Sequence, residues 1–151
     1  MASTDTPIQS SFGGQYPMRV CDATLTVGAA VTSATFTSTS KFRGTVEKIE
    51  IDPGAAMTTS ATLKGYEANT PLATATRDHF LNYTFPASEV ELVWYPVKPI
   101  ALNTGVAETA TYDGTHAIVD YTKYVVNDYL TIDLASATAG DSVRVRIYVR
   151  G

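Results

Sequence analysis

The last ten residues, 142–151, alternate apolar and polar side chains up to the final glycine. Side chains of a β-strand point to opposite faces with a period of two, so alternate residues share a face. The apolar set is Val143, Val145, Ile147 and Val149. The other set is Arg144, Arg146, Tyr148 and Arg150. The pattern predicts a core strand that carries a cationic outer stripe.

Short β-like runs separated by turn residues fill the rest of the chain. The expected strands cover residues 20–27, 31–36, 45–51, 61–66, 80–85, 90–95, 98–102, 117–121, 123–126, 129–134 and 142–149. Asp52-Pro53-Gly54 predicts a chain reversal, and Asn127-Asp128 predicts a two-residue hairpin. Pro96 and Pro99 indicate an edge strand or a crossing between sheets. Short strands at spacings of about 8–12 residues predict an all-β fold, an antiparallel, jelly-roll-like β-sandwich.

Residues 1–17 contain Ser, Thr, Gln, Gly and Pro with isolated apolar residues and show no period. We expect an N-terminal arm over residues 1–17 and one β-sandwich domain over residues 18–151. The arm is either a disordered terminus or a segment that becomes ordered on a neighbouring subunit. In the second case Ile8, Phe12 and Tyr16 would be its anchors.

Composition narrows the possible partners. Charged residues make up only 17% of the chain, and threonine and serine are expected to cover much of the surface. The net charge of −4 argues against nucleic acid as a partner, because phosphate binding needs clustered Lys and Arg. No apolar run approaches the roughly 18 residues of a membrane span, and we expect no membrane segment and no leader. Cys21 is the single cysteine, so no internal disulfide is expected.

Two histidines have a carboxylate nearby, which is the raw material of a general base or a metal site. His79 follows Asp78, and His116 lies three residues after Asp113. Neither has a recognisable catalytic spacing, and the G-x-S-x-G motif of serine hydrolases is missing from the sequence. A loop apex is the simpler interpretation of residues 113–116.

Paired acids raise the possibility of glycoside hydrolysis, which needs two carboxylates facing one cleft. The pairs are Glu47 with Glu50, Glu89 with Glu91, and Asp128 with Asp133. Solvated strand faces give the same spacing, and no EF-hand pattern is present. We therefore expect no enzymatic activity, no cofactor and no metal site.

Aromatic residues offer a sugar-stacking platform or a protein interface. The chain has nine tyrosines and one tryptophan, Trp94, whose alternation with Val90 and Leu92 indicates a core position. Five tyrosines remain as candidates, Tyr112, Tyr121, Tyr124, Tyr129 and Tyr148. Tyrosine is common at protein interfaces, so we expect an oligomer interface formed by Tyr121, Tyr124, Tyr129 and Tyr148.

The arginine stripe also has two interpretations. Guanidinium groups on an outer sheet face can be solvated and discourage edge-to-edge aggregation. Alternatively, Arg144, Arg146 and Arg150 bind carboxylates of a partner in bidentate fashion.

The second half of the chain resembles a known family in its rhythm and turn placement. The residues that carry the resemblance are Tyr95-Pro96-Val97 leading into Asn103-Thr104-Gly105, residues 124–132, and Ala137-Thr138-Ala139-Gly140-Asp141. They are similar to small all-β decoration, or cement, proteins of tailed bacteriophages, over roughly residues 90–151. The hairpin at Asn127-Asp128 lacks the glycine that related patterns often have, and the first half resembles no family that can be named.

The resemblance implies a jelly-roll-like homotrimer on the outer capsid surface of the virion, made in the host cytoplasm and bound to the major capsid protein. The arm anchors and the arginines would contact the capsid. A carbohydrate- or receptor-binding module, using exposed tyrosines and residues 113–116, is the main alternative, and a hydrolase ranks last.

Overall fold

The computed structural model describes residues 8–10, 17–55, 57, 60–68, 79–86, 92–99, 109–111, 117–119 and 121–151. Every secondary-structure element in these ranges is a β-strand, and every strand pairing between them is antiparallel. The strands are β1 (Ile8–Ser10), β2 (Met18–Thr26), β3 (Ala34–Thr37), β4 (Phe42–Asp52), β5 (Thr62–Glu67), β6 (Leu81–Thr84), β7 (Leu92–Trp94), β8 (Val97–Pro99), β9 (Thr109–Thr111), β10 (Ala117–Val119), β11 (Tyr121–Lys123), β12 (Val125–Asp128), β13 (Leu130–Ala135) and β14 (Ser142–Arg150).

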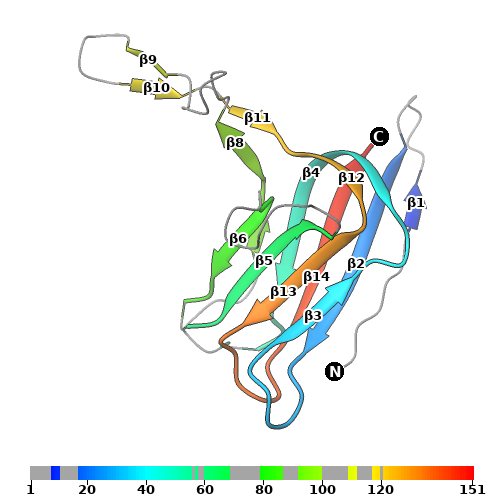
Figure 1. Ribbon diagram of the computed structural model, residues 1–151, viewed down its shortest axis with the longest axis vertical. Coiled ribbons are helices and arrows are strands. Elements are labelled where there is room, and N and C mark those ends of the chain that lie inside the picture. Colours follow the sequence, from blue (N-terminus) through cyan, green and yellow to red (C-terminus); the bar gives the residue numbers. More distant parts are fainter. Residues whose placement is uncertain are drawn as a thin grey trace.

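Two sheets form the body of the molecule and face each other (Figure 1). Sheet A has the order β1-β2-β14-β4-β12, with β7 also paired to β4. Sheet B has the order β3-β13-β5-β6. The terminal strand β14 therefore lies between β2 and β4 in the middle of sheet A, which explains why its apolar side is so regular.

One hydrophobic core lies between the two sheets. Sheet A contributes fully buried side chains that include Leu25, Ile49 and Ile147. Sheet B contributes Leu63, Ile132 and Leu134. Each of these residues belongs to the inward-facing set of its strand, as the alternation requires. The expected antiparallel all-β fold is thus confirmed for the described residues.

A β-bulge changes the outer face of β4. Tyr148 pairs with Lys48 and Val149 pairs with Val46, so Glu47 has no partner residue on β14. Val46 and Ile49 are both fully buried, and the two residues between them point away from the core. The extra residue of a bulge re-aims side chains. Glu47 and Lys48, although adjacent in sequence, consequently lie on the same outer face.

The hairpin predicted at Asn127-Asp128 is wrong. Both residues belong to β12, where they pair with Arg43 and Phe42 of β4 in sheet A. The next strand, β13, pairs with β3 and β5 in sheet B. The chain therefore crosses from one sheet to the other at Tyr129, because residues 127 and 128 extend the ladder with β4 instead of reversing the chain.

Other expectations are confirmed or shifted at their boundaries. Trp94 packs against the core on an edge strand, as the alternation and the nearby prolines indicated. The strand expected at 31–36 is displaced to β3, and the one expected at 117–121 is divided between β10 and β11. The strands β1 and β9 were not expected from the sequence pattern.

Part of the predicted N-terminal arm forms β1. Ile8 of β1 pairs with Val20 of β2. The side chain of Val20 is buried, although Val20 pairs with Tyr148 and therefore lies on the outer face of sheet A. The other two predicted anchors, Phe12 and Tyr16, lie outside the described residues. The arm as a whole stays a prediction.

A narrow β-ribbon leaves the edge of sheet A. It consists of the ladders β8–β11 and β9–β10, and Figure 1 shows both lying away from the two sheets. The ribbon begins between β7, which pairs with Ile49–Ile51, and β12, which pairs with Phe42–Thr45. The Val46 amide donates to the Tyr124 carbonyl over 2.9 Å and fixes its base.

Candidate interaction surface

The outer face of sheet A carries ordered columns of charge. The stripe on β14 faces outward as predicted, with Arg144, Arg146 and Arg150 exposed or half-buried. In register, Arg146 lies between Asp22 of β2 and Glu50 of β4. The arginines of β14 are thus flanked by carboxylates on both neighbouring strands. We call this set of side chains the charged lattice; its members are Asp22, Glu47, Lys48, Glu50, Arg144, Arg146, Tyr148 and Arg150.

Each arginine of the stripe is paired with an acid of its own chain. Arg144 binds Asp22 in bidentate fashion, with Nε to Oδ1 at 2.9 Å and Nη2 to Oδ2 at 2.5 Å. Arg146 Nε lies 3.3 Å from Glu50 Oε2. Arg150 Nε lies 3.6 Å from Glu47 Oε1, on the bulge. Carboxylates therefore surround the stripe within the chain, and binding of partner carboxylates by these arginines stays a prediction.

A compact cluster at Glu50 holds the middle of the lattice. Tyr148 Oη donates to Glu50 Oε2 over 2.9 Å, and Lys48 Nζ lies 2.8 Å from Glu50 Oε1. The Lys48 ammonium also sits 4.4 Å from the centroid of the Tyr148 ring. Such contacts fix the ring of Tyr148 against the sheet, so this tyrosine is a structural part of the lattice.

The charged lattice lowers the pKa values of Asp22 and Glu50. The hydrogen bond from Arg144 lowers the pKa of Asp22 and outweighs the opposing effect of burial. Burial by itself would raise the pKa of Glu50, but hydrogen bonds from Lys48 and Tyr148 and the charge of Arg146 lower it overall. Burial, followed by the hydrogen bond to Glu50, raises the pKa of Tyr148. Both carboxylates are therefore ionised at neutral pH.

An apolar border runs beside the charged lattice. It consists of four exposed side chains, Val93 (43%), Tyr95 (68%), Val97 (49%) and Val125 (68%). Val93 pairs with Glu50, and Val125 pairs with Thr45, which pairs with Arg150, so both lie on the outer face of sheet A. Val31, in the turn between β2 and β3, is the other large hydrophobic exposed among the described residues. Exposed apolar side chains along one edge of a sheet offer area for an interaction site.

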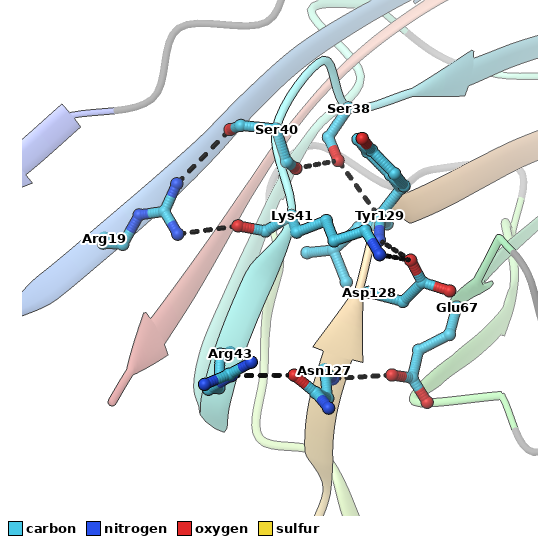
Figure 2. A network of polar contacts seen from close by, with 10 residues as sticks. Arg19, Ser38, Ser40, Lys41, Arg43, Glu67, Asn127, Asp128 and Tyr129 are labelled. Carbon is cyan, nitrogen blue, oxygen red and sulfur yellow. Dashed lines mark hydrogen bonds and ion pairs between the residues drawn. The ribbon is translucent and has the colours of Figure 1, made fainter.

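The end of the molecule at the β3–β4 turn is closed by a polar network (Figure 2). Arg19 donates from Nη1 to the Lys41 carbonyl over 2.7 Å and from Nη2 to Ser40 Oγ over 3.3 Å. Its guanidinium also lies 4.4 Å from the centroid of the Phe42 ring. Arg19 therefore ties β2 to this turn and is a structural residue.

The crossing from β12 to β13 belongs to the same network. Asp128 Oδ1 accepts from the Tyr129 amide over 2.8 Å and lies 3.8 Å from Lys41 Nζ (Figure 2). The Asn127 amide donates to Glu67 Oε1 over 2.6 Å. The bond from Asn127 links sheet A to sheet B, while Asp128 binds the first residue after the crossing and the β3–β4 turn.

The predicted interface tyrosines occupy different settings. Tyr124 packs against the core, Tyr129 lies in the end network near Lys41, and Tyr148 lies in the charged lattice. The side chain of Tyr121 is not among the described ones. The structure does not bring the three described tyrosines onto one face, and an interface through all of them stays a prediction.

The candidate catalytic residues are likewise dispersed. Tyr66 Oη donates to Asp133 Oδ2 over 2.5 Å, and His79 lies edge-on to Tyr66 at a centroid distance of 5.6 Å. Asp133 is in sheet B, whereas its predicted partner Asp128 is in sheet A. Glu47 and Glu50 share the outer face of sheet A, where each is held in ion pairs. The further catalytic candidates Glu89, Glu91 and His116, and the aromatic candidate Tyr112, lie outside the described residues.

The part of the chain that the structure describes contains no group of three or more His, Cys, Asp or Glu side chains that could hold a metal ion. Within the same ranges, no helix is long and apolar enough to cross a membrane.

The apolar border is the feature that sequence reasoning missed. Its signal was present, because the alternation that buries Trp94 turns Val93 and Tyr95 to the opposite face. Val125 could not be added to them from the sequence, since it joins the border only through pairing with β4. Comparison of the chain with protein-family models, with curated proteins and with solved structures gives no match.

Proposed function

We propose that this protein is a non-enzymatic assembly protein that forms a trimer and binds the outer surface of a capsid as a decoration protein. The observation that carries the proposal is the apolar border beside the charged lattice on the outer face of sheet A. The exposed border offers area for contact between the subunits of the trimer, while the ion pairs of the lattice are already made within the chain.

Magnitudes favour the border over the arginines as the source of docking energy. An exposed ion pair contributes about 0–1 kcal/mol, because water already solvates both charges. Complete burial of one large apolar side chain contributes about 1.5–3 kcal/mol. Covering Val93 and Tyr95 would therefore contribute more than re-pairing the arginines, whose role is to orient the partner.

The strand order supports the jelly-roll part of the proposal. In sheet A, β2 lies beside the last strand, β14, which is followed by β4. In sheet B, β3 lies beside the penultimate strand, β13, which is followed by β5 and β6. A folded-over hairpin of this kind is the organisation of jelly rolls, which occur in viral capsid proteins and in lectins. Fold alone does not choose between these uses, so the interaction surface must decide.

In the proposed assembly, the ribbon and the arm extend from sheet A and contact neighbouring subunits. A two-stranded ribbon is at best marginally stable by itself, and contact with a neighbouring subunit would stabilise it. In this proposal the arm extends from β1 at one edge of sheet A, and the ribbon extends from the β4 side at the other. Several weak contacts on one trimer then act together through a high effective concentration.

The experiment that tests the proposal is the solution mass of the whole chain by light scattering, with a charged variant of the border. We expect a trimer over a wide concentration range, and Val93→Glu to dissociate it because the new carboxylate would be buried beside Glu50. Val31→Glu is the matched control, since Val31 is similarly exposed, at 48% against 43% for Val93, but lies in the turn between β2 and β3. A monomer at every concentration, or a Val93→Glu protein as trimeric as the control, would contradict the proposal.

A further inference from the structure

A cavity of about 340 Å³ opens at one end of sheet A. It lies between the turn that follows β4 and the turn that precedes β14, and Thr24, Asp52 and Arg144 are among its walls. Thr24 pairs with Arg144 near one end of the β2–β14 ladder, whereas Arg19 of the Figure 2 network pairs near the other. The cavity and the end network are therefore at opposite ends of the molecule.

Hydrogen bonds hold the walls of this cavity in place. The Val27 amide donates to the Asp141 carbonyl, and the Gly140 amide donates to the Val27 carbonyl, both over 2.9 Å. Asp52 Oδ1 accepts from the Gly54 amide over 2.9 Å, and Asp141 Oδ2 accepts from the Thr138 amide over 2.8 Å. The two carboxylates are thus oriented before any ligand arrives, which lowers the entropic cost of binding.

The lining combines hydrogen-bonding groups with an apolar floor. Thr24 and Ser142 contribute hydroxyls, Asp52 and Asp141 contribute carboxylates, and the buried side chain of Met57 contributes apolar surface. A carboxylate has about four lone-pair positions, so the bond from the Gly54 amide leaves Asp52 further capacity to accept. These groups can hydrogen-bond to a ligand on several sides.

Arg144 completes the lining and constrains the charge of the ligand. It uses Nε and one N–H of Nη2 on Asp22, which leaves about three of its five N–H donors for other acceptors. A guanidinium in one wall disfavours a cation, and two carboxylates in the other walls disfavour an anion. A neutral ligand that both donates and accepts hydrogen bonds satisfies all of these groups.

We infer that this cavity binds a neutral, hydroxyl-rich ligand of the size of one sugar ring. The volume is near the lower limit of small-molecule sites, which is about 300 Å³. Hydroxyls of the ring would donate to Asp52 and accept from Arg144, while a C–H face would lie on Met57. The site is separate from the apolar border, so it goes beyond the proposed assembly function.

The test is a titration of the ¹⁵N-labelled whole chain, followed by amide chemical shifts, with methyl α-mannoside, methyl β-galactoside and methyl N-acetyl-β-glucosaminide as probes. We expect saturable shifts at Gly54, Gly140 and Ser142 with at least one probe, with a dissociation constant on the order of millimolar. Absence of shifts at these amides with all three probes, up to about 50 mM, would overturn the inference. Saturable shifts with spermidine or inorganic phosphate, but not with a glycoside, would overturn it as well.

A carboxylate variant separates specific binding from general surface effects. Asp52→Asn keeps the oxygen that accepts from the Gly54 amide, so the turn is preserved while the charge is lost. We expect it to weaken glycoside binding about tenfold or more. Asp133→Asn, on the opposite sheet, is the matched control and should bind like the unaltered chain. Equal affinities of the two variants would place the binding site elsewhere.

Discussion

Replacement of Gly44 by alanine should be unusually destabilising, because the backbone of β14 ends directly against this residue. Gly44 has a φ of +134°, and a Cβ built on it would lie 2.2 Å from the Arg150 carbonyl oxygen and 2.7 Å from the Gly151 Cα. Both neighbours are backbone atoms, so no side-chain rotation can relieve the clash. An alanine would have to push the end of β14 away from β4.

The size of the effect follows from three contributions. Placing a non-glycine residue at this φ costs about 1–3 kcal/mol, and forcing an extra carbon into a packed region costs about 1–3 kcal/mol. The lower entropy of the unfolded chain offsets about 0.4–1 kcal/mol. We therefore expect Gly44→Ala to lower the free energy of unfolding by about 1–5.5 kcal/mol.

Gly54 provides the matched control. Its φ is +65°, and a Cβ there would meet nothing within 4 Å. Only the backbone strain of about 1–2 kcal/mol applies, with the same entropic offset, so Gly54→Ala should cost about 0–1.5 kcal/mol. Urea unfolding followed by circular dichroism would measure both variants at equal slope m. A loss at Gly44 no greater than the loss at Gly54 would refute the close approach of β4 and β14.

Further predictions concern the acids, the core and the lattice. The lowered pKa values of Asp22 and Glu50 stabilise the fold fully above their ordinary values of 3.8 and 4.5, and this stabilisation is lost as the pH falls through the lower folded-state values. Urea unfolding between about pH 2 and 7 should therefore show a weaker pH dependence in an Asp22→Asn, Glu50→Gln variant, and an unchanged dependence would contradict this. Ile147→Ala, at a fully buried position, should cost about 2–5 kcal/mol. Val125→Ala, at an exposed one, should change the free energy of unfolding by less than about 0.5 kcal/mol, and equal losses in urea would show that the two residues do not differ in burial as described. Tyr148→Phe removes the donor to Glu50 and should raise the pKa of Glu50 in a carboxyl NMR titration; an unaltered titration would contradict the hydrogen bond.

The faces of the strands could be predicted because they follow from local backbone geometry. The alternation in residues 142–149 placed Val145 in the core and Arg146 outside, and the same argument placed Trp94 against the core. The β4 bulge also left a trace, since Val46, Ile49 and Ile51 break a strict period of two. A spacing of three between buried positions in a strand indicates an inserted residue.

Turn signals were less informative, because they do not say which sheet a strand will join. Asn127-Asp128 has the composition of a hairpin turn, yet both residues are paired with β4 and the chain changes sheet at Tyr129. The segment pairs with β4 and does not form a local hairpin, because this long strand offers ladder bonds to residues far away in sequence. The local turn propensity of two residues is weak compared with the stabilisation from such strand pairing.

The sequence by itself determined the all-β class, the approximate strands and the inward and outward sets of side chains, because all three depend on neighbouring residues. Only the tertiary structure decided which residues meet. Asp22 and Arg144 are separated by 122 residues and Glu50 and Tyr148 by 98, and each pair forms because strand pairing places them on one face. The cavity arises in the same way where β2, β4 and β14 align, and Val93 and Val125 join the apolar border through the pairing of β7 and β12 with β4. The physical reason is that the direction of a side chain is fixed by local dihedral angles, whereas its neighbours are fixed by the most stable pairing of the whole chain.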